Sequence, residues 1–266
     1  MKKLCQFSIY LALLIQGWCF CSASPTTQPV GEVCYKPTKD DLAHGKLQTE
    51  QMLHDLPAMK QWLTKGNPFY DFAVEHYAAD AKGNSIFWVP FVEDGWKTDG
   101  CNAISVSAKD DVCGSISIRK FDCKTNRAFL AEELWFCFIF ESFNTFNGHR
   151  FNKIKSEARA GKMTREQFIL SSCNDEYLNA KQTKKYYLDY VIPWSKQTGI
   201  KTNGTRWFFN IPQTFEQYMK FYQDRNKYPW SFYGKYYDES IVSKKWALIF
   251  SRLTSYNFRR KIHERP

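Results

Sequence analysis

The 266-residue sequence lacks the short motifs that identify many enzyme classes. It has no GxSxG nucleophile elbow, no P-loop and no dinucleotide-binding fingerprint. It also has no internal repeat and no low-complexity tract. Function must therefore be sought in individual side chains rather than in a signature motif.

Histidine is scarce, and no two cysteines form a CxxC pair. The 5 histidines never occur at metal-ligand spacing. The absence of CxxC argues against a structural zinc ribbon. From these patterns we expect neither a metal nor a cofactor.

Long apolar runs are absent beyond the first residues. A basic start, the apolar run Ile9–Phe20 and the small residues after it predict a cleaved signal peptide over residues 1–23. Lipidation at Cys19 or Cys21 is the alternative. No later segment approaches the roughly 20 apolar residues that a membrane span needs. We expect a secreted or periplasmic protein with no transmembrane segment after cleavage.

Cysteine is well represented for an exported chain. Three of the 9 cysteines (Cys5, Cys19 and Cys21) would leave with the signal peptide, and the even set that remains suits disulfide bonds. The disulfide candidates are Cys34, Cys101, Cys113, Cys123, Cys137 and Cys173. Local bridging within Cys101, Cys113 and Cys123, with a bridge between Cys137 and Cys173, is the preferred pairing.

The chain is basic, with a formal charge of +10 that falls to about +8 once Lys2 and Lys3 are removed with the signal. Solubility alone accounts for such a charge, and attraction to anionic envelope surfaces is the functional alternative. Lysine and arginine are scattered among acids, which argues against nucleic acid as a partner. The partners we expect are a cell-envelope polymer or another exported protein.

Hydrophobic periodicity and turn signals predict an α+β fold. We expect a small sheet in the N-terminal half, then a buried helix and a mainly helical C-terminal half. Predicted helices cover residues 38–54, 57–66, 127–147, 151–160, 164–190 and 214–222, and predicted strands cover 86–92, 103–107 and 115–121. A strand at 207–210 and a helix at 240–254 are further expectations, and 69–78 is ambiguous between strand and helix.

One domain should account for residues 24–266. Its core is expected at about 86–191, followed by an aromatic-rich extension over 192–266. Within that extension, the segment Tyr228–Tyr237 is dense in aromatic residues. Its rings either stack on sugars or on a partner, or cover the core as a loop.

The segment Arg127–Asn147 is the most informative part of the sequence. It predicts a helix that is apolar on nearly every side and yet carries carboxylates and amides. At about 100° per residue, one stripe of this helix holds Glu133, Cys137, Phe140, Glu141 and Asn144. Because a helix this apolar must be buried, its acids need internal partners or a chemical role.

A strand followed by this helix and by a second long helix resembles the layout of the zincin metallopeptidases. In that fold the first helix carries HExxH, in which two histidines bind zinc beside a glutamate base. Here Glu133 stands at the position of the base, whereas Glu132 and Phe136 replace the two histidines. Glu176 stands where a third ligand would lie. Phenylalanine cannot bind zinc, so the resemblance implies a zincin-like core that has lost its metal site.

The same helix also resembles exported bacterial proteins that share the pattern F-E-x-x-N-x-x-N, here Phe140–Asn147. That resemblance implies no activity.

The acids are the catalytic candidates, namely Glu133, Glu141 and Glu176, and the ligand-binding candidates are Asn144 and His149. Glu133 and Glu141 lie about 12 Å apart along the helix axis, too far for a simple acid pair. Glu132 or Glu133 paired with Glu176 is a closer arrangement.

The structural alternative is that arginines neutralise the acids of the helix. Glu133 and Glu141 would then accept charge-assisted hydrogen bonds from Arg119, Arg127, Arg150 or Arg165.

Three functional hypotheses follow. The favoured one is an exported, disulfide-containing protein with a zincin-like core, no metal, and a binding or structural role. The second is a cell-envelope hydrolase that uses the buried carboxylates of residues 127–147. The third is a carbohydrate or cell-wall binder that uses the segment Tyr228–Tyr237.

Overall fold

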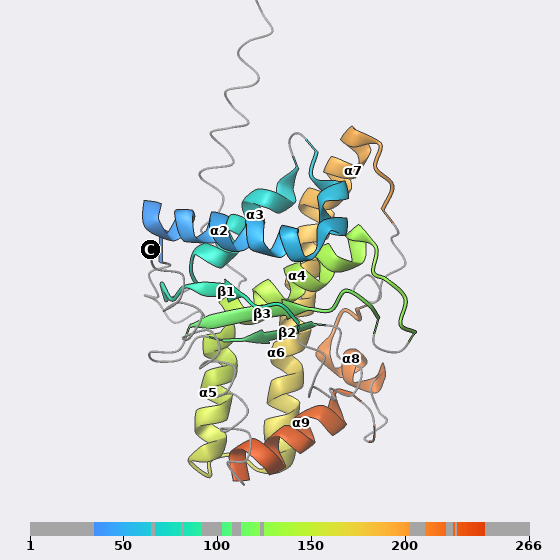
Figure 1. The fold of residues 1–266 in the computed structure, drawn as a ribbon. Coiled ribbons are helices and arrows are strands. Elements are labelled where there is room, and N and C mark those ends of the chain that lie inside the picture. Colours follow the sequence, from blue (N-terminus) through green and yellow to red (C-terminus); the bar gives the residue numbers. More distant parts are fainter. Residues whose placement is uncertain are drawn as a thin grey trace, which may run out of the picture. The chain divides into compact units, whose positions relative to one another are not determined.

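In the computed structural model, helix α2 (Lys39–Asp55) begins at the position that the sequence predicts (Figure 1). The Thr38 side chain accepts a hydrogen bond from the backbone N–H of Asp41, and the Asp41 carboxylate accepts one from the backbone N–H of Thr38 at 2.8 Å. This capping box satisfies N–H groups that have no partner within the helix.

The structure describes residues 35–64, 67–80, 82–91, 103–107, 113–122, 125–202, 211–221, 226 and 228–242. The elements after α2 are the 3₁₀ turn η1 (Pro57–Trp62), α3 (Pro68–Ala78), β1 (Ile86–Trp88), β2 (Ala103–Val106), β3 (Gly114–Ile118), α4 (Ala131–Phe146), α5 (Gly148–Arg159), α6 (Arg165–Tyr186), the π-helical η2 (Tyr187–Val191), α7 (Ile192–Thr198), α8 (Phe215–Phe221), α9 (Trp230–Tyr236) and the π-helical η4 (Tyr237–Val242). They belong to one unit, Pro37–Pro266. The predicted α+β class is confirmed.

Several predictions fall outside the described residues. These are the signal peptide over residues 1–23, the strand at 207–210 and the part of the 240–254 helix beyond residue 242. The ambiguous segment 69–78 is helical, because the Asn67 side chain caps its first turn and Pro68 is tolerated there.

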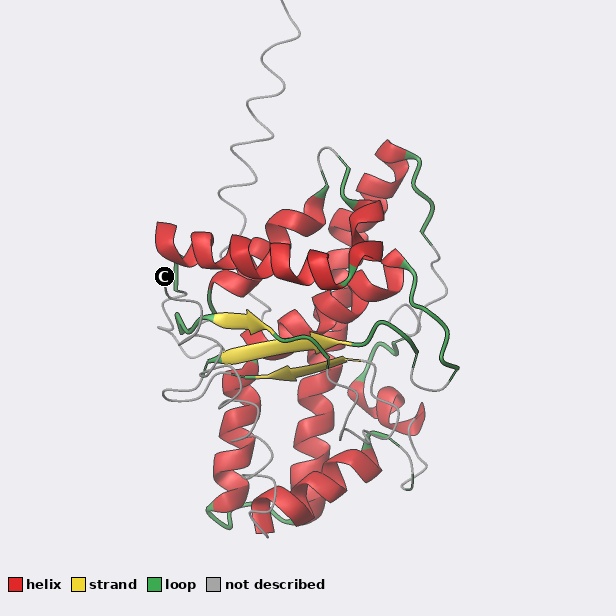
Figure 2. Ribbon diagram, viewed as in Figure 1, coloured by secondary structure: helices red, strands yellow, loops and turns green. Residues whose placement is uncertain are grey.

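The sheet has the strand order β1-β3-β2 (Figure 2). β1 runs parallel to β3, and β2 runs antiparallel to it. Helix α2 closes the outer edge of β1: the His44 Nε2–H donates to the carbonyl of Ile86 at 2.9 Å, and the Gln48 Oε1 accepts from the backbone N–H of Trp88 at 2.9 Å. Side chains of α2 therefore form hydrogen bonds with backbone groups of β1 that could otherwise pair with another strand.

The main core is aromatic and lies where η1, α3, α4 and α7 meet. Phe69 stacks on Trp135 with ring centroids 5.0 Å apart, and the Trp135 Nε1–H donates to the carbonyl of Met59 at 2.9 Å. Rings from all four elements complete the cluster, including Trp62, Phe72, Phe136, Phe138 and Trp194. Helix α4 is apolar on nearly every side because this core covers one side of it and the sheet and α6 cover others.

A second core lies between α5, α6 and α9. In Figure 1, α5 and α6 run side by side, and α9 crosses the end of the pair. Phe168 and Cys173 are buried here, and Tyr233 and Tyr236 of α9 pack against the cluster. The segment Tyr228–Tyr237 thus covers the core, mostly as a helix rather than as the expected loop.

The long helix predicted over 164–190 extends further, past Pro193, where a proline was expected to end it. Helix α6 continues through η2 into α7, and Pro193 lies in the first turn of α7. Proline cannot donate a hydrogen bond to the preceding turn, and its ring collides with a carbonyl there. The wider π-helical turn directly before it accommodates both effects. The helix ends instead at Gly199, which has φ 73°.

Gly148 lets the junction of α4 and α5 approach the end of β2 closely. A Cβ atom at this position would lie 2.1 Å from the Oγ and 2.2 Å from the Cβ of Ser107. The glycine therefore fixes how near α4 lies to the strand.

We predict that Gly148→Ala lowers the free energy of unfolding by roughly 1–3 kcal/mol, because the new methyl group overlaps Ser107. Urea denaturation measures the loss. The double variant with Ser107→Gly removes the overlapping atoms and should recover most of the stability. A single variant as stable as the wild type would contradict the close approach.

Candidate functional site

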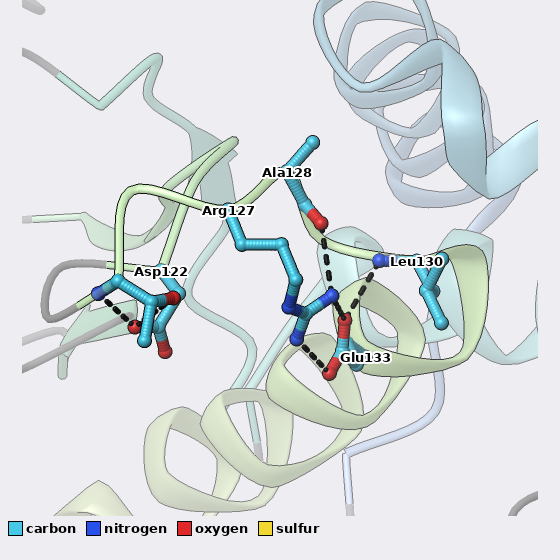
Figure 3. A network of polar contacts seen from close by, with 6 residues as sticks. Asp122, Arg127, Ala128, Leu130 and Glu133 are labelled. Atoms are coloured by element: carbon cyan, nitrogen blue, oxygen red, sulfur yellow. Dashed lines mark hydrogen bonds and ion pairs between the residues drawn. The ribbon is translucent and has the colours of Figure 1, made fainter.

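Glu133 closes the N-terminal end of α4 (Figure 3). Its Oε2 accepts from the backbone N–H of Leu130 at 2.8 Å, and Arg127 donates to both carboxylate oxygens at 2.7 and 3.0 Å. The predicted bond from Arg127 is confirmed. An N-terminal carboxylate also interacts favourably with the helix dipole. Glu133 is therefore engaged in local structure.

Glu141 binds the open edge of β2. Its carboxylate accepts hydrogen bonds from the backbone N–H and the hydroxyl of Ser105, and from the Asn144 side chain at 3.1 Å. The residue is only 7% exposed. Burial raises the pKa of Glu141, and the bonds from Ser105 and Asn144 oppose that rise. Within the described part of the chain its partners are these polar groups and not an arginine.

Glu176 lies close enough to Glu141 for their charges to interact, whereas the predicted pairing was with Glu132 or Glu133. Burial raises the pKa of Glu176 to about 8, the hydrogen bond from Tyr233 opposes the rise, and the charge of Glu141 adds to it. The Tyr233 hydroxyl donates to Glu176 at 2.9 Å. Eight residues, about 12 Å along the axis of α4, separate Glu133 from Glu141. Because Glu176 on α6 lies near Glu141, it is remote from Glu133.

Amide side chains join α4 to α6 beside the two acids. The Asn179 Nδ2 donates to the Oδ1 of Asn144 at 2.7 Å. Asn147 donates to Asn179 at 2.9 Å and to Gln182 at 2.7 Å. Asn144, a predicted ligand-binding residue, is thus occupied within the protein.

Asn179 and Gln182 were not among the predicted site residues. The signal that marks them is helical spacing, because Asp175, Asn179 and Gln182 are three to four residues apart and share one face of α6.

Asp175 is bound by Arg150 and also lies near His149. The Arg150 Nε lies 2.6 Å from the Asp175 Oδ1, and Arg150 also donates to the Oδ1 of Asn179. Burial raises the pKa of Asp175, and the charges of Arg150 and His149 oppose that rise. The structure therefore places His149, the second predicted ligand-binding residue, near Asp175.

The cysteines of the described residues do not form the predicted bridge between α4 and α6. Cys137 and Cys173 are not joined, and Cys113 is an exposed thiol. Cys173 packs in the core shared with α5 and α9, and burial raises the pKa of its thiol. Cys34, Cys101 and Cys123 lie outside the described residues, so disulfide formation as a whole stays a prediction.

No metal cluster replaces the missing HExxH in the residues that the structure describes. No three histidine, cysteine or acidic side chains lie together in a way that could hold an ion. At the position of the second histidine, Phe136 packs its ring against Tyr187 at 5.0 Å and Trp62 at 6.5 Å. The Phe136 side chain is therefore part of the aromatic core.

A groove of about 420 Å³ lies near the C-terminal end of α2. Its lining includes Asp55, Trp88, Lys120, Phe121 and Asn126. No sequence motif marks these residues, because they come from three separate segments of the chain.

No protein-family model, curated protein or solved structure matches the chain. The resemblance to zincins therefore stays a prediction. Among the described helices, none is both long enough and apolar enough to cross a membrane.

We predict that Glu176 by itself makes the protein less stable as pH rises from about 4.5 to 8. Between about pH 4.5 and 8, the folded state keeps a proton that the unfolded chain has released, so the free energy of unfolding falls as pH rises. Glu176→Gln stays neutral and its carbonyl still accepts from Tyr233. At pH 8 this variant should be more stable than the wild type by on the order of a few kcal/mol.

Denaturation curves between pH 5 and pH 9 measure this effect. Glu166→Gln is the matched control, because Glu166 is an exposed acid on the same helix. Equal pH dependence in the wild type and in Glu176→Gln would show that Glu176 holds no such proton.

Proposed function

We propose that this protein is an exported, non-hydrolytic binding protein, built on a zincin-like core that has lost its metal site. Its partner would be a cell-envelope polymer or another exported protein. The observation that carries the proposal is the hydrogen bonding of Glu141 to the edge of β2. The acid that a hydrolase would present to its substrate is used to close the sheet.

The edge of β2 supports this interpretation. An open edge strand is where an extended peptide adds to a sheet through its main chain. Here the carboxylate of Glu141 takes the backbone N–H of Ser105, and the junction at Gly148 packs against Ser107. A peptide substrate would have to displace both.

The internal partners of the other acids give further support. A catalytic carboxylate must come within hydrogen-bond distance of the substrate proton. Glu133 is held by Arg127 and Leu130, and Glu176 is held by Tyr233. Both are buried or nearly so, with Glu176 9% exposed.

A hydrolase that uses Glu141 and Glu176 is the second candidate. The observation that favours it is the interaction of the two carboxyls, which helps to raise the pKa of Glu176 to about 8. Acid pairs with raised pKa values are typical of sites where one carboxyl donates a proton and the other accepts one.

We predict that the full chain, expressed with export and purified without added metal, contains far less than one equivalent of zinc. We also expect no turnover on panels of peptides and soluble glycans above that of the double variant Glu141→Gln, Glu176→Gln. Elemental analysis and product chromatography provide the two measurements.

Stoichiometric zinc together with chelator-sensitive peptidase activity would contradict the proposal. Metal-independent turnover that Glu176→Gln abolishes, while the variant keeps its circular dichroism spectrum, would instead establish the hydrolase. Glu166→Gln again serves as the control.

A further inference from the structure

The groove of about 420 Å³ lies at the carboxyl ends of two parallel strands. Trp88 is the last residue of β1, and Ile118 is the last residue of β3. Pro90 and Phe91 follow the first strand, and Lys120 and Phe121 follow the second. In sheets with parallel strands and covering helices, the crevice beyond these ends is the usual place for a ligand.

The floor of the groove is apolar and held in position. Leu56 and Ile118 are buried, and the Trp88 Nε1–H donates to the Asp55 Oδ2 at 2.8 Å. Phe121 remains 45% exposed and is held by a β-bridge to Ala128. The groove therefore offers an aromatic ring to solvent above a fixed base.

Polar groups of balanced charge lie around this ring. Lys120 supplies an ammonium group and Asn126 an amide, whereas the Asp55 carboxylate adds a negative charge with both oxygens already engaged, Oδ2 by Trp88 at 2.8 Å and Oδ1 by His54 at 3.3 Å. Asn126 has φ 53°, and its backbone N–H donates to the carbonyl of Asp122 at 2.8 Å. A main-chain hydrogen bond thus holds the backbone of Asn126.

This combination selects one class of ligand. A small anion would be attracted by Lys120 and repelled by Asp55, and a small cation the reverse. A wholly apolar ligand would cover these polar groups without bonding to them, which is costly. A sugar ring has an apolar face that can lie on Phe121, and hydroxyls that both donate and accept.

We propose that the groove at Trp88 and Phe121 binds a neutral sugar ring. The proposal rests on the binding role proposed above and names its ligand class. It places carbohydrate recognition at the sheet, away from the segment Tyr228–Tyr237.

The test uses the full chain and two neutral probes, cellotetraose and N-acetylchitotetraose, titrated by calorimetry. We expect at least one to bind, and we expect Phe121→Ala to weaken that binding at least tenfold. Asn126→Gly should weaken it severalfold, because glycine keeps the positive φ and removes only the amide. Phe232→Ala, which removes an aromatic ring of similar exposure (43%) from α9, should leave it unchanged.

The outcomes separate this inference from the function on which it rests. If neither oligosaccharide binds, or if binding survives Phe121→Ala in a variant that melts with the wild type, the groove is not a sugar site. Loss of binding in Phe232→Ala alone would move recognition to α9 and leave the binding role intact. Release of new reducing ends from either probe would overturn the non-hydrolytic role itself.

Discussion

Helix α4 packs against the sheet, η1 and α6, and its burial requires the polar side chains on it to find partners inside the protein. The structure meets this requirement at two places. Near the first turn, Glu133 takes the free N–H of Leu130 and the guanidinium of Arg127. About two turns later, Glu141 takes the N–H and hydroxyl of Ser105, and the neighbouring amides connect to α6. These bonds connect α4 to the edge of the sheet and to α6.

The same requirement limits what the acids do chemically. A carboxylate whose oxygens already accept fixed hydrogen bonds has little capacity left for a substrate, and Glu133 is the clearest case. Glu141 and Glu176 differ, because burial raises the pKa of both carboxyls, and the charge of Glu141 adds to the rise for Glu176. Protonation removes a buried charge from the interface of α4 and α6, so the pair contributes to folding as a proton-binding element.

The polar cluster around Glu141, Asn144 and Glu176 and the groove at Trp88 lie in different parts of the unit. They follow from different features of the sequence. The cluster is built from α4, α5, α6 and α9, where helices bring amides and acids together. The groove is built where β1 and β3 end, close to the C-terminal end of α2. The buried acids and the groove are therefore separate features of the unit.

Local sequence was enough to predict the capping of α2 by Thr38, the order of most elements and the burial of α4, because each depends on residues within a few turns of one another. It also named Arg127 among four arginines that could bind Glu133, and these two residues lie six positions apart. The pairing of Glu141 with Glu176, the hydrogen bonds to Ser105 and the groove join segments that are far apart in the chain. Helical and strand periodicity contains no information on which faces will meet. Only the packing of α4 against β2 and α6 decided that Glu176 lies near Glu141, and only the parallel alignment of β1 with β3 placed Trp88 and Phe121 in one groove.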